Sequence, residues 1–360
     1  MSKVAYLIIT DLHLSGSNLR GRYDYLKEVS YVISKIIELG NKYRAEGYTE
    51  VNLIFLGDIV DRSYKDLTKG IYTNNIFVAF LNIFNNMFSV VGNHELSYYT
   101  DNPFWTLMES ISSNKIETIK NKTWQPQGFI QLINVVDRLE CGDVVFHFNH
   151  SNVGISVPEK DKINIGLFHQ DIIAKAITEE MKNQFGMDIF EVQPRYFDKT
   201  SVLYGYDYAF FGHMHKVYGH WTYICDSTKY KTELFYLASL GRTNHTEVSN
   251  NFLERDIPAV ILENDKFARI EHNKFNLMTR EECVKEEIVL NNQMVREKKK
   301  EIKYVIENVP ALDEPIKSIE SALVKEPVLH MLFSDYRKDG YSKIESALLN
   351  RVEDILNEYR

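Results

Sequence analysis

Several short apolar segments of this sequence run directly into a turn that carries an aspartate, an asparagine or a histidine. In the first of these turns, Asp11 and His13 are two residues apart, so their side chains point to the same side of an extended segment. The side chains of this kind that could bind a metal are Asp11, His13, Asp58, Asn93, His169, His213 and His215. Carboxylate, amide and imidazole ligands without a thiolate suit Mn²⁺, Fe or Zn²⁺ better than Mg²⁺.

These side chains are more than a single ion needs. A carboxylate that lies between two sets of ligands can bridge a pair of ions ~3.5–4 Å apart. Such a pair activates a water molecule and stabilises the oxygens around phosphorus during an in-line displacement. Gly57 precedes Asp58 and permits a close approach of the backbone at that point. The residue types therefore indicate a two-metal hydrolytic centre.

The candidate ligands follow segments that have the length and composition of buried strands. Those segments are Val4–Thr10, Val51–Leu56, Met87–Val91, Ile163–Phe168 and Tyr208–Phe211. Amphipathic helices are predicted between them, over Tyr25–Glu46, Ile71–Asn85 and Ile172–Phe185. This alternation predicts an α/β layered fold, in which ligands bind beyond the carboxyl ends of the strands. The polar turns should therefore meet at one rim.

The character of the chain changes beyond about residue 275. Two more strands, Val144–Phe148 and Leu234–Leu237, precede this point. After it, Met278–Lys303 is charged and helical in pattern, and Tyr341–Arg360 has the pattern of a terminal amphipathic helix. We predict a catalytic domain over residues 1–275 and a smaller C-terminal region over residues 276–360.

The composition is that of a globular protein, with 44% hydrophobic and 26% charged residues among 360. The net charge of −8 gives no support to a dedicated nucleic-acid binder, which is usually basic. The three cysteines are far apart and are expected to be reduced thiols. No apolar run reaches the length of a membrane span, and the N-terminus has no cleavage-site pattern. We expect a cytoplasmic protein of a bacterium or of a phage-infected host cell.

Five motifs in order give the sequence a resemblance to a known family. The motifs are Thr-Asp11-Leu-His13, Gly57-Asp58-Ile-Val-Asp61-Arg62, Gly92-Asn93-His94-Glu95, His169 after an apolar strand, and Gly212-His213-Met-His215. Together they resemble the successive motifs of calcineurin-like metallophosphoesterases over roughly residues 4–245. The resemblance implies a layered sandwich of mixed sheets flanked by helices, here with a smaller C-terminal α-rich appendage.

The resemblance also implies a division of the ligands between two divalent ions, for which Mn²⁺ is the expected metal. One ion would be held by Asp11, His13, Asp58 and His215. The other would be held by Asp58, Asn93, His169 and His213, with Asp58 as the bridge.

Further roles follow for residues that are not ligands. His94 would face the phosphate, where an imidazole can stabilise charge or protonate the leaving group near neutral pH. Asp61 would orient ligands or His94, although it could instead cap the following helix. Arg62 and Lys216 could bind substrate phosphate, and a structural salt bridge is the alternative for Arg62.

Two other histidines compete with His169 for the role of mid-chain ligand. His147 and His150 also follow an apolar segment. We favour His169 because a strand precedes it and a helical pattern follows it, and because it comes directly before the last motif.

Within the family the sequence is most similar to SbcD-type nuclease subunits, which work with an SMC-like ATPase. The similarity rests on Tyr206-Asp207-Tyr208 before the last motif and on the pair His169-Gln170. The third motif ends in Glu95, where these nucleases usually have an aspartate. A glutamate at this position is commoner in protein phosphatases. Gln170 argues against a phosphatase, where a glycine pair is expected.

Three functions are consistent with the sequence. The first is a DNA exonuclease or endonuclease, whose C-terminal region would dock on the ATPase. The second is a phosphodiesterase for a small, cyclic or linear nucleotide, and the third is a non-catalytic scaffold. The C-terminal region could alternatively pack on its own domain or form a homodimer. A nucleic-acid groove could be lined by Arg20, Arg22, Tyr23, Tyr98, Tyr99, Phe104, Trp105 and Lys216.

Overall fold

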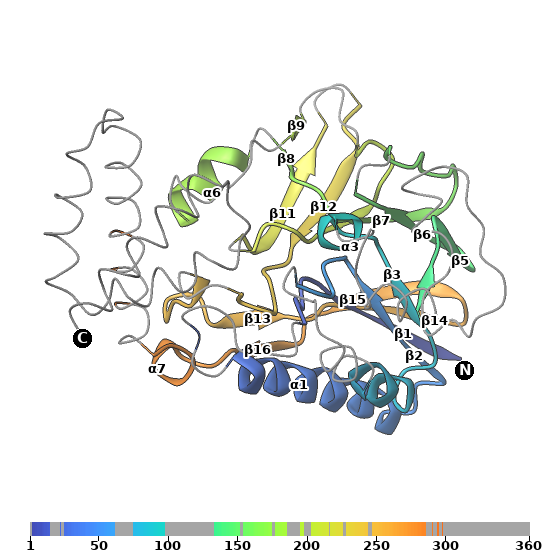
Figure 1. The fold of residues 1–360 in the computed structure, drawn as a ribbon. Coiled ribbons are helices and arrows are strands. Elements are labelled where there is room, and N and C mark those ends of the chain that lie inside the picture. Colours follow the sequence, from blue (N-terminus) through green and yellow to red (C-terminus); the bar gives the residue numbers. More distant parts are fainter. Residues whose placement is uncertain are drawn as a thin grey trace, which may run out of the picture. The chain divides into compact units, whose positions relative to one another are not determined.

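The computed structural model describes a large part of the chain and divides it into two compact units, Met1–Val284 and Lys285–Arg360. The described residues are 2–14, 22, 25–61, 75–97, 133–151, 154–174, 177–185, 195–197, 203–215, 217–225, 228–243, 247–285, 290, 294 and 297. Within the first unit they form two six-stranded sheets with helices outside them (Figure 1). No helix of the described part is both long and apolar enough to cross a membrane.

The first sheet has the strand order β15-β14-β1-β2-β3-β4. Its strands are β1 (Lys3–Ile9), β2 (Glu50–Phe55), β3 (Met87–Ser89), β4 (Asn134–Val135), β14 (Ala259–Glu263) and β15 (Lys266–Glu271). Strands β1 to β4 are parallel to one another, and Ile9, Phe55 and Ser89 are consecutive partners across them. These strands therefore end at the same edge of the sheet.

The second sheet has the order β11-β12-β10-β7-β6-β5 and repeats this arrangement. Its strands are β5 (Arg138–Cys141), β6 (Val144–Asn149), β7 (Ile163–Phe168), β10 (Tyr208–Phe211), β11 (Gly219–Ile224) and β12 (Lys231–Tyr236). Strands β6, β7, β10 and β12 are parallel, whereas the edge strands β5 and β11 are antiparallel.

Smaller elements complete the described part. Two-stranded sheets pair β8 (Ile172–Ala174) with β9 (Arg195–Phe197), and β13 (Glu254–Asp256) with β16 (Lys274–Asn276). The helices are α1 (Tyr25–Ala45), α3 (Asn93–Ser97), α6 (Thr178–Phe185) and α7 (Arg280–Cys283), with a further helical segment at 75–81.

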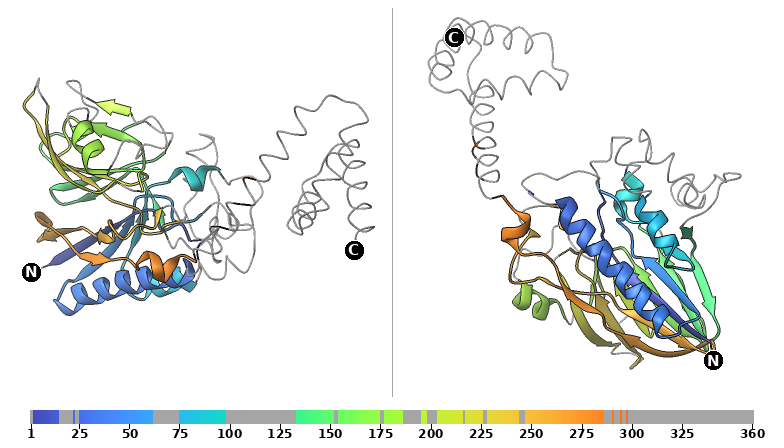
Figure 2. Two further views of the ribbon diagram at one scale, coloured as in Figure 1. Left: turned by 90° about the vertical axis from the view of Figure 1, so that its left-hand side faces the viewer. Right: turned by 90° about the horizontal axis from the view of Figure 1, so that it is seen from below.

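The alternation of side chains along each strand divides the core between layers. In β1, Leu7 and Ile9 pack toward α1, whereas Tyr6 and Ile8 pack against the second sheet. The cluster between the sheets also contains Phe146 of β6 and Phe210 of β10. Figure 2 shows the two sheets stacked, with α1 along the outer face of the first. The mixed-sheet sandwich that the sequence predicts is confirmed.

All five strands that precede the candidate ligands are present, with bounds that differ by at most two residues from the prediction. The helix predicted over Ile172–Phe185 is wrong in its first part. Ile172–Ala174 forms β8, and α6 begins only at Thr178. The apolar residues of this segment have helical spacing, but pairing with β9 and the burial of Ile172 and Ile173 favour a strand. Both effects depend on distant parts of the chain and cannot be recognised from the local sequence.

The helix predicted over Met278–Lys303 is interrupted near its start. Helix α7 ends at Cys283, and Val284 is extended and bridges to Arg22. The first unit thus ends at Val284, and the boundary at residue 275 stays a prediction. The predicted terminal helix Tyr341–Arg360 lies outside the described residues.

Candidate metal centre

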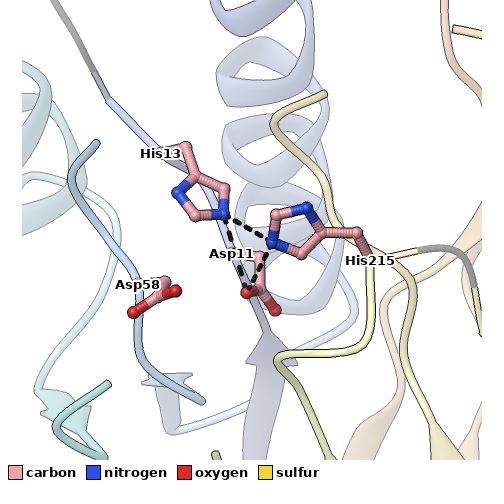
Figure 3. Close-up of side chains that lie close together, drawn as sticks. All are labelled: Asp11, His13, Asp58 and His215. Atoms are coloured by element: carbon pink, nitrogen blue, oxygen red, sulfur yellow. Dashed lines mark hydrogen bonds and ion pairs between the residues drawn. The ribbon is translucent and has the colours of Figure 1, made fainter. Parts of the chain in front are cut away.

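Two aspartates and two histidines from three separate turns meet beyond the carboxyl ends of the strands (Figure 3). One ligand atom of each of Asp11, His13, Asp58 and His215 lies within 4.8 Å of the others. The Nε2 atoms of His13 and His215 are 2.9 Å apart, and Asp11 Oδ1 lies 3.7 Å and 3.6 Å from them. Lone pairs that converge in this way are the arrangement a cation requires.

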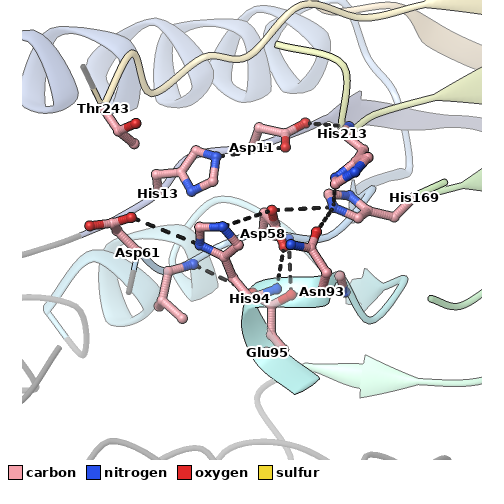
Figure 4. A network of polar contacts seen from close by, with 12 residues as sticks. Asp11, His13, Asp58, Asp61, Asn93, His94, Glu95, His169, His213 and Thr243 are labelled. Atoms are coloured by element: carbon pink, nitrogen blue, oxygen red, sulfur yellow. Dashed lines mark hydrogen bonds and ion pairs between the residues drawn. The ribbon is translucent and has the colours of Figure 1, made fainter. Parts of the chain in front are cut away.

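A second set of potential ligands gathers around His169 Nε2 (Figure 4). This atom lies 3.0 Å from Asn93 Oδ1, 3.2 Å from His213 Nδ1 and 3.2 Å from Asp58 Oδ2. Asp58 belongs to both sets. The structure thus assembles the two groups that the family resemblance implies, with the shared aspartate between them. Coordination of a metal by each residue stays a prediction.

The backbone of these turns is held in an uncommon conformation. Asp11, His13, Asp58 and His213 have φ of 47°, 46°, 48° and 78°, in the left-handed region that favours glycine. Such strain persists where the surrounding structure fixes it and is concentrated at functional sites. Here it turns the side chains at the strand ends toward the centre.

Two motif glycines are required by close packing around the aspartates. A Cβ atom at Gly92 would lie 2.2 Å from Asp58 Oδ1, and one at Gly212 would lie 2.1 Å from Thr10 Oγ1. Any side chain at either position would displace a carboxylate or its hydrogen-bond donor. The glycines before Asn93 and His213 therefore have a steric cause.

Each aspartate uses its two oxygens differently. Asp11 Oδ2 accepts hydrogen bonds from the Thr10 hydroxyl and from the backbone N–H of His213, and Asp58 Oδ1 accepts one from the N–H of His94. The other oxygens, Asp11 Oδ1 and Asp58 Oδ2, are buried and face the imidazoles: Asp58 Oδ2 lies 3.2 Å from His169 Nε2, and Asp11 Oδ1 lies 3.7 Å and 3.6 Å from the Nε2 atoms of His13 and His215. Buried carboxylate oxygens of this kind are costly unless a cation pairs with them. The residues present therefore fit a pair of divalent ions.

The histidines are oriented by their second ring nitrogens. His169 Nδ1–H donates to the carbonyl of Leu56 at 2.6 Å, which leaves Nε2 as the ligand atom. His213 Nε2 lies 3.2 Å from Asp171 Oδ2, and His215 Nδ1 lies 3.2 Å from Glu247 Oε1. The sequence did not single out either carboxylate. Asp171 could have been found from its place two residues after His169, whereas Glu247 has no local signal.

Without a metal ion, the carboxylates and the imidazoles of the centre stabilise each other's charged forms. Burial raises the pKa of Asp58, but the imidazoles of His169, His13 and His94 outweigh it and hold the pKa well below its usual range. Burial lowers the pKa of His169, but the Asp58 carboxylate raises it to about 10. For His215, Glu247 and Asp11 likewise overcome burial and raise the pKa to about 9. Protons on these imidazoles occupy the place that metal cations would take.

His94 lies beside the centre, with 12% of its side chain exposed. Its Nε2 is 3.7 Å from Asp58 Oδ2, and its Nδ1 is 3.8 Å from Asp61 Oδ1 (Figure 4). Asp61 lies next to His94, and the orienting role that the resemblance implies for it stays a prediction. Because His94 lies next to the shared Asp58, its imidazole could donate a proton to a group that reacts at the centre.

Glu95 has a structural role that its sequence position did not reveal. Its side chain is buried and accepts backbone hydrogen bonds from Asp58 at 2.9 Å, Ile59 at 2.7 Å and Gly92 at 2.8 Å. Burial and the charge of Asp58 raise the pKa of Glu95 to about 7, against the effect of these N–H groups. Through these hydrogen bonds, Glu95 connects the turn after β2 to the turn after β3.

The remaining candidates lie elsewhere or outside the described part. His147 Nε2 is 2.9 Å from Asn164 Oδ1, and His150 Nδ1 accepts the N–H of Val91 at 3.0 Å. Neither histidine belongs to the groups of potential ligands in the described part. Arg62 and Lys216 lie outside the described residues. So do most of the residues proposed for a nucleic-acid groove.

Arg22 does not line such a groove, contrary to expectation. Its side chain is buried and pairs with Glu28, which also pairs with the buried Arg242. The segment Tyr206-Asp207 is likewise structural: Tyr206 is buried, and Asp207 accepts hydrogen bonds from the N–H of Asn164 and the hydroxyl of Tyr230.

The match to a protein-family model agrees with this centre. Residues 5–217 match the family model of calcineurin-like phosphoesterases, whereas no curated protein matches the chain. Similar solved structures include a 5'-nucleotidase precursor from Thermus thermophilus, with 12% identity and a TM-score of 0.38, covering 80% of this chain and 58% of that one. A dimetal phosphatase from Danio rerio has 12% identity and a TM-score of 0.39, with coverage of 76% and 99%.

The chain therefore spans little more than half of the length of that nucleotidase. The family match covers more than half of this chain and contains every candidate ligand, from Asp11 to His215. The chain belongs to the calcineurin-like phosphoesterase family and carries its cluster of Asp and His residues for two metal ions.

Proposed function

We propose that this protein hydrolyses phosphodiester bonds of DNA in a reaction that depends on two divalent metal ions, as the nuclease subunit of a complex with an SMC-like ATPase. The observation that carries the hydrolytic part is the shared position of Asp58 between two ligand sets, with His94 beside it. Mn²⁺ is the proposed metal on the family resemblance, and the ligand set of oxygens and imidazoles without a thiolate would also suit Fe or Zn²⁺.

A bound metal pair would supply positive charge beside the phosphate oxygens and lower the pKa of a water molecule. Asp58 would contribute to holding both ions, because it belongs to both ligand sets and the backbone N–H of His94 fixes its Oδ1. His94 would hold a proton near the leaving oxygen and transfer it as that oxygen departs, with Asp61 fixing the ring.

DNA is proposed as the substrate on the strength of the sequence similarity to SbcD-type subunits. The similarity includes Gln170, whose side chain donates to the carbonyl of His150 at 2.9 Å and so ties the turn after β7 to the end of β6. The ATPase partner is proposed on the same basis, and residues 276–360 are the proposed docking region.

A small nucleotide is the second candidate substrate, because acidic side chains contact two of the candidate ligand histidines. Asp171 and Glu247 are the side chains that meet His213 and His215 from outside the centre. Carboxylates in these positions repel a long polyanion more than a single phosphodiester. The net charge of −8 acts in the same direction.

The test is hydrolysis in the presence of Mn²⁺, comparing labelled linear DNA with cyclic and linear nucleotides. Degradation of DNA by the protein, and none by an Asp58→Ala variant purified in parallel, is the expected result. Turnover of one nucleotide with inert DNA would replace the first proposal by the second. Absence of any phosphoester hydrolysis would contradict both.

A further inference from the structure

The two histidines of the last motif present opposite ring nitrogens to the centre. His213 turns Nδ1 toward His169 Nε2, at 3.2 Å, and its Nε2 toward Asp171 Oδ2, also at 3.2 Å. His215 turns Nε2 toward His13 Nε2, at 2.9 Å, and its Nδ1 toward Glu247 Oε1, at 3.2 Å. Each imidazole ring thus lies between the centre and one carboxylate.

A carboxylate accepts a hydrogen bond only from a protonated ring nitrogen, so it fixes which nitrogen keeps its lone pair for a metal. We infer that Asp171 and Glu247 are positioning residues that make His213 an Nδ1 ligand and His215 an Nε2 ligand, one for each metal ion. This inference rests on the proposed two-metal centre and is independent of the choice between DNA and a nucleotide.

The two carboxylates differ in what positions them. The Thr243 hydroxyl lies 3.4 Å from both oxygens of Glu247, which is 10% exposed. Asp171 follows Gln170, whose side chain is anchored on the end of β6, and precedes the buried β8. Glu247 is therefore held by a residue outside the ligand turns, whereas Asp171 is placed by the backbone of the short turn that also carries His169.

His169 provides an internal contrast. It is oriented by the neutral carbonyl of Leu56, so its ligand strength does not gain from an outer negative charge. At His213 and His215 the outer partner is charged, which makes the imidazole a stronger ligand. Removal of that charge, with the acceptor oxygen retained, should weaken metal binding by about 10–100-fold.

The experiment measures Zn²⁺ binding to the full-length metal-free protein by calorimetry with a competing chelator. The test variants are Asp171→Asn and Glu247→Gln, which keep an acceptor oxygen and lose the charge. The matched controls alter histidine–carboxylate pairs of the same kind outside the centre. They are Asp256→Asn, whose Oδ2 lies 2.5 Å from His272 Nδ1, and Glu233→Gln, whose Oε2 lies 2.7 Å from His220 Nε2.

Each test variant should lose about 10–100-fold in affinity for one of two Zn²⁺ ions, and both controls should bind as the original protein does. Test variants that bind Zn²⁺ as tightly as the controls would overturn the inference, while the two-metal centre would stand. An original protein that binds no Zn²⁺ would instead overturn the centre itself.

A second measurement is independent of the folding of any variant. Nitrogen-15 NMR of selectively labelled histidine in the Zn²⁺-loaded protein distinguishes a metallated ring nitrogen from a protonated one. His213 should carry the metal on Nδ1 and a proton on Nε2, and His215 should show the reverse. The same ligating nitrogen in both rings would overturn the inference.

Discussion

The side chains that face the metal centre divide their polar atoms between the centre and the protein. Asp11 and Asp58 anchor one oxygen on a backbone N–H and leave the other toward the imidazoles. His169 anchors Nδ1 on a carbonyl and leaves Nε2. His94 differs, because its ring lies between the carboxylates of Asp58 and Asp61 and belongs to neither of the two ligand sets. At the scale of the residue, binding and proton transfer thus belong to different side chains.

Replacement of His94 tests this separation. The His94→Ala variant should keep both metal ions, because neither ligand set needs His94. Its kcat should fall by roughly 10²–10⁴-fold through loss of the proton donor. Metal content by mass spectrometry and kcat with an aryl phosphodiester check the two parts. His220→Ala, at an exposed histidine on β11, is the control and should leave both unchanged. An unaltered kcat in His94→Ala would remove His94 from the mechanism.

Metal binding should release protons, because the metal-free centre keeps them on its histidines. The pKa values of His169 and His215 are raised to about 10 and 9, so both imidazoles are protonated at pH 7. A metal binds only the neutral form, so about two protons should leave at pH 7 and fewer above pH 9. Affinity should therefore increase with pH over this range.

Calorimetry in buffers of different ionisation enthalpy measures this proton release directly. An equal number of protons released at pH 7 and at pH 9.5 would contradict the charge balance described for the centre.

At the scale of the element, short turns at the ends of parallel strands made most of the centre predictable. Five candidate ligands each follow a strand that can be recognised from its local apolar pattern: Asp11, Asp58, Asn93, His169 and His213. Their convergence could be predicted because ligands of such folds bind beyond the carboxyl ends of the strands. Contacts between distant turns could not be predicted in this way. Burial of Arg22 against Glu28, the partners of Glu95 and the contact of Glu247 with His215 all depend on tertiary packing.

Glu95 is the element-scale contact most open to test. In Glu95→Gln, an amide N–H₂ replaces an oxygen that faces backbone N–H groups of Asp58, Ile59 or Gly92. Each donor left unsatisfied costs about 1–3 kcal/mol, so the free energy of unfolding should fall by about that amount.

Urea unfolding of the metal-free protein measures this loss without a contribution from metal binding. Glu263→Gln, at an exposed ion pair with Arg269, is the control and should change the free energy of unfolding by less than about 0.5 kcal/mol. Equal stability of the two variants would show that Glu95 does not hold the turns.

At the scale of the whole molecule, the first unit is closed by the segment that follows β16. Arg242 donates to the carbonyl of Met278 at 2.6 Å, and Arg22 donates to the carbonyl of Cys283 at 3.5 Å. Both arginines pair with Glu28 of α1. The backbone N–H of Gly241, next to Arg242, donates to the carbonyl of Asp11. Residues near Val284 are therefore linked to a metal-site turn through buried contacts.

Two truncations separate this segment from the rest of the C-terminal region. A chain that ends at Lys285 keeps Met278 and Cys283, whereas one that ends at Asn276 loses both. The longer chain should bind two metal ions and remain folded. The shorter chain should be less stable by at least about 1–3 kcal/mol, because buried arginine N–H groups lose their acceptors. Equal thermal and urea stability of the two chains would contradict this role for residues 277–285.

The central claim is that one aspartate is shared between two metal sites, and metal stoichiometry in an Asp58→Ala variant tests it most directly. The original protein should bind two Mn²⁺ or Zn²⁺ ions per chain at saturation. The variant should lose high affinity at both sites together, because Asp58 belongs to both ligand sets. Two ions bound with unchanged affinity in Asp58→Ala would contradict the account.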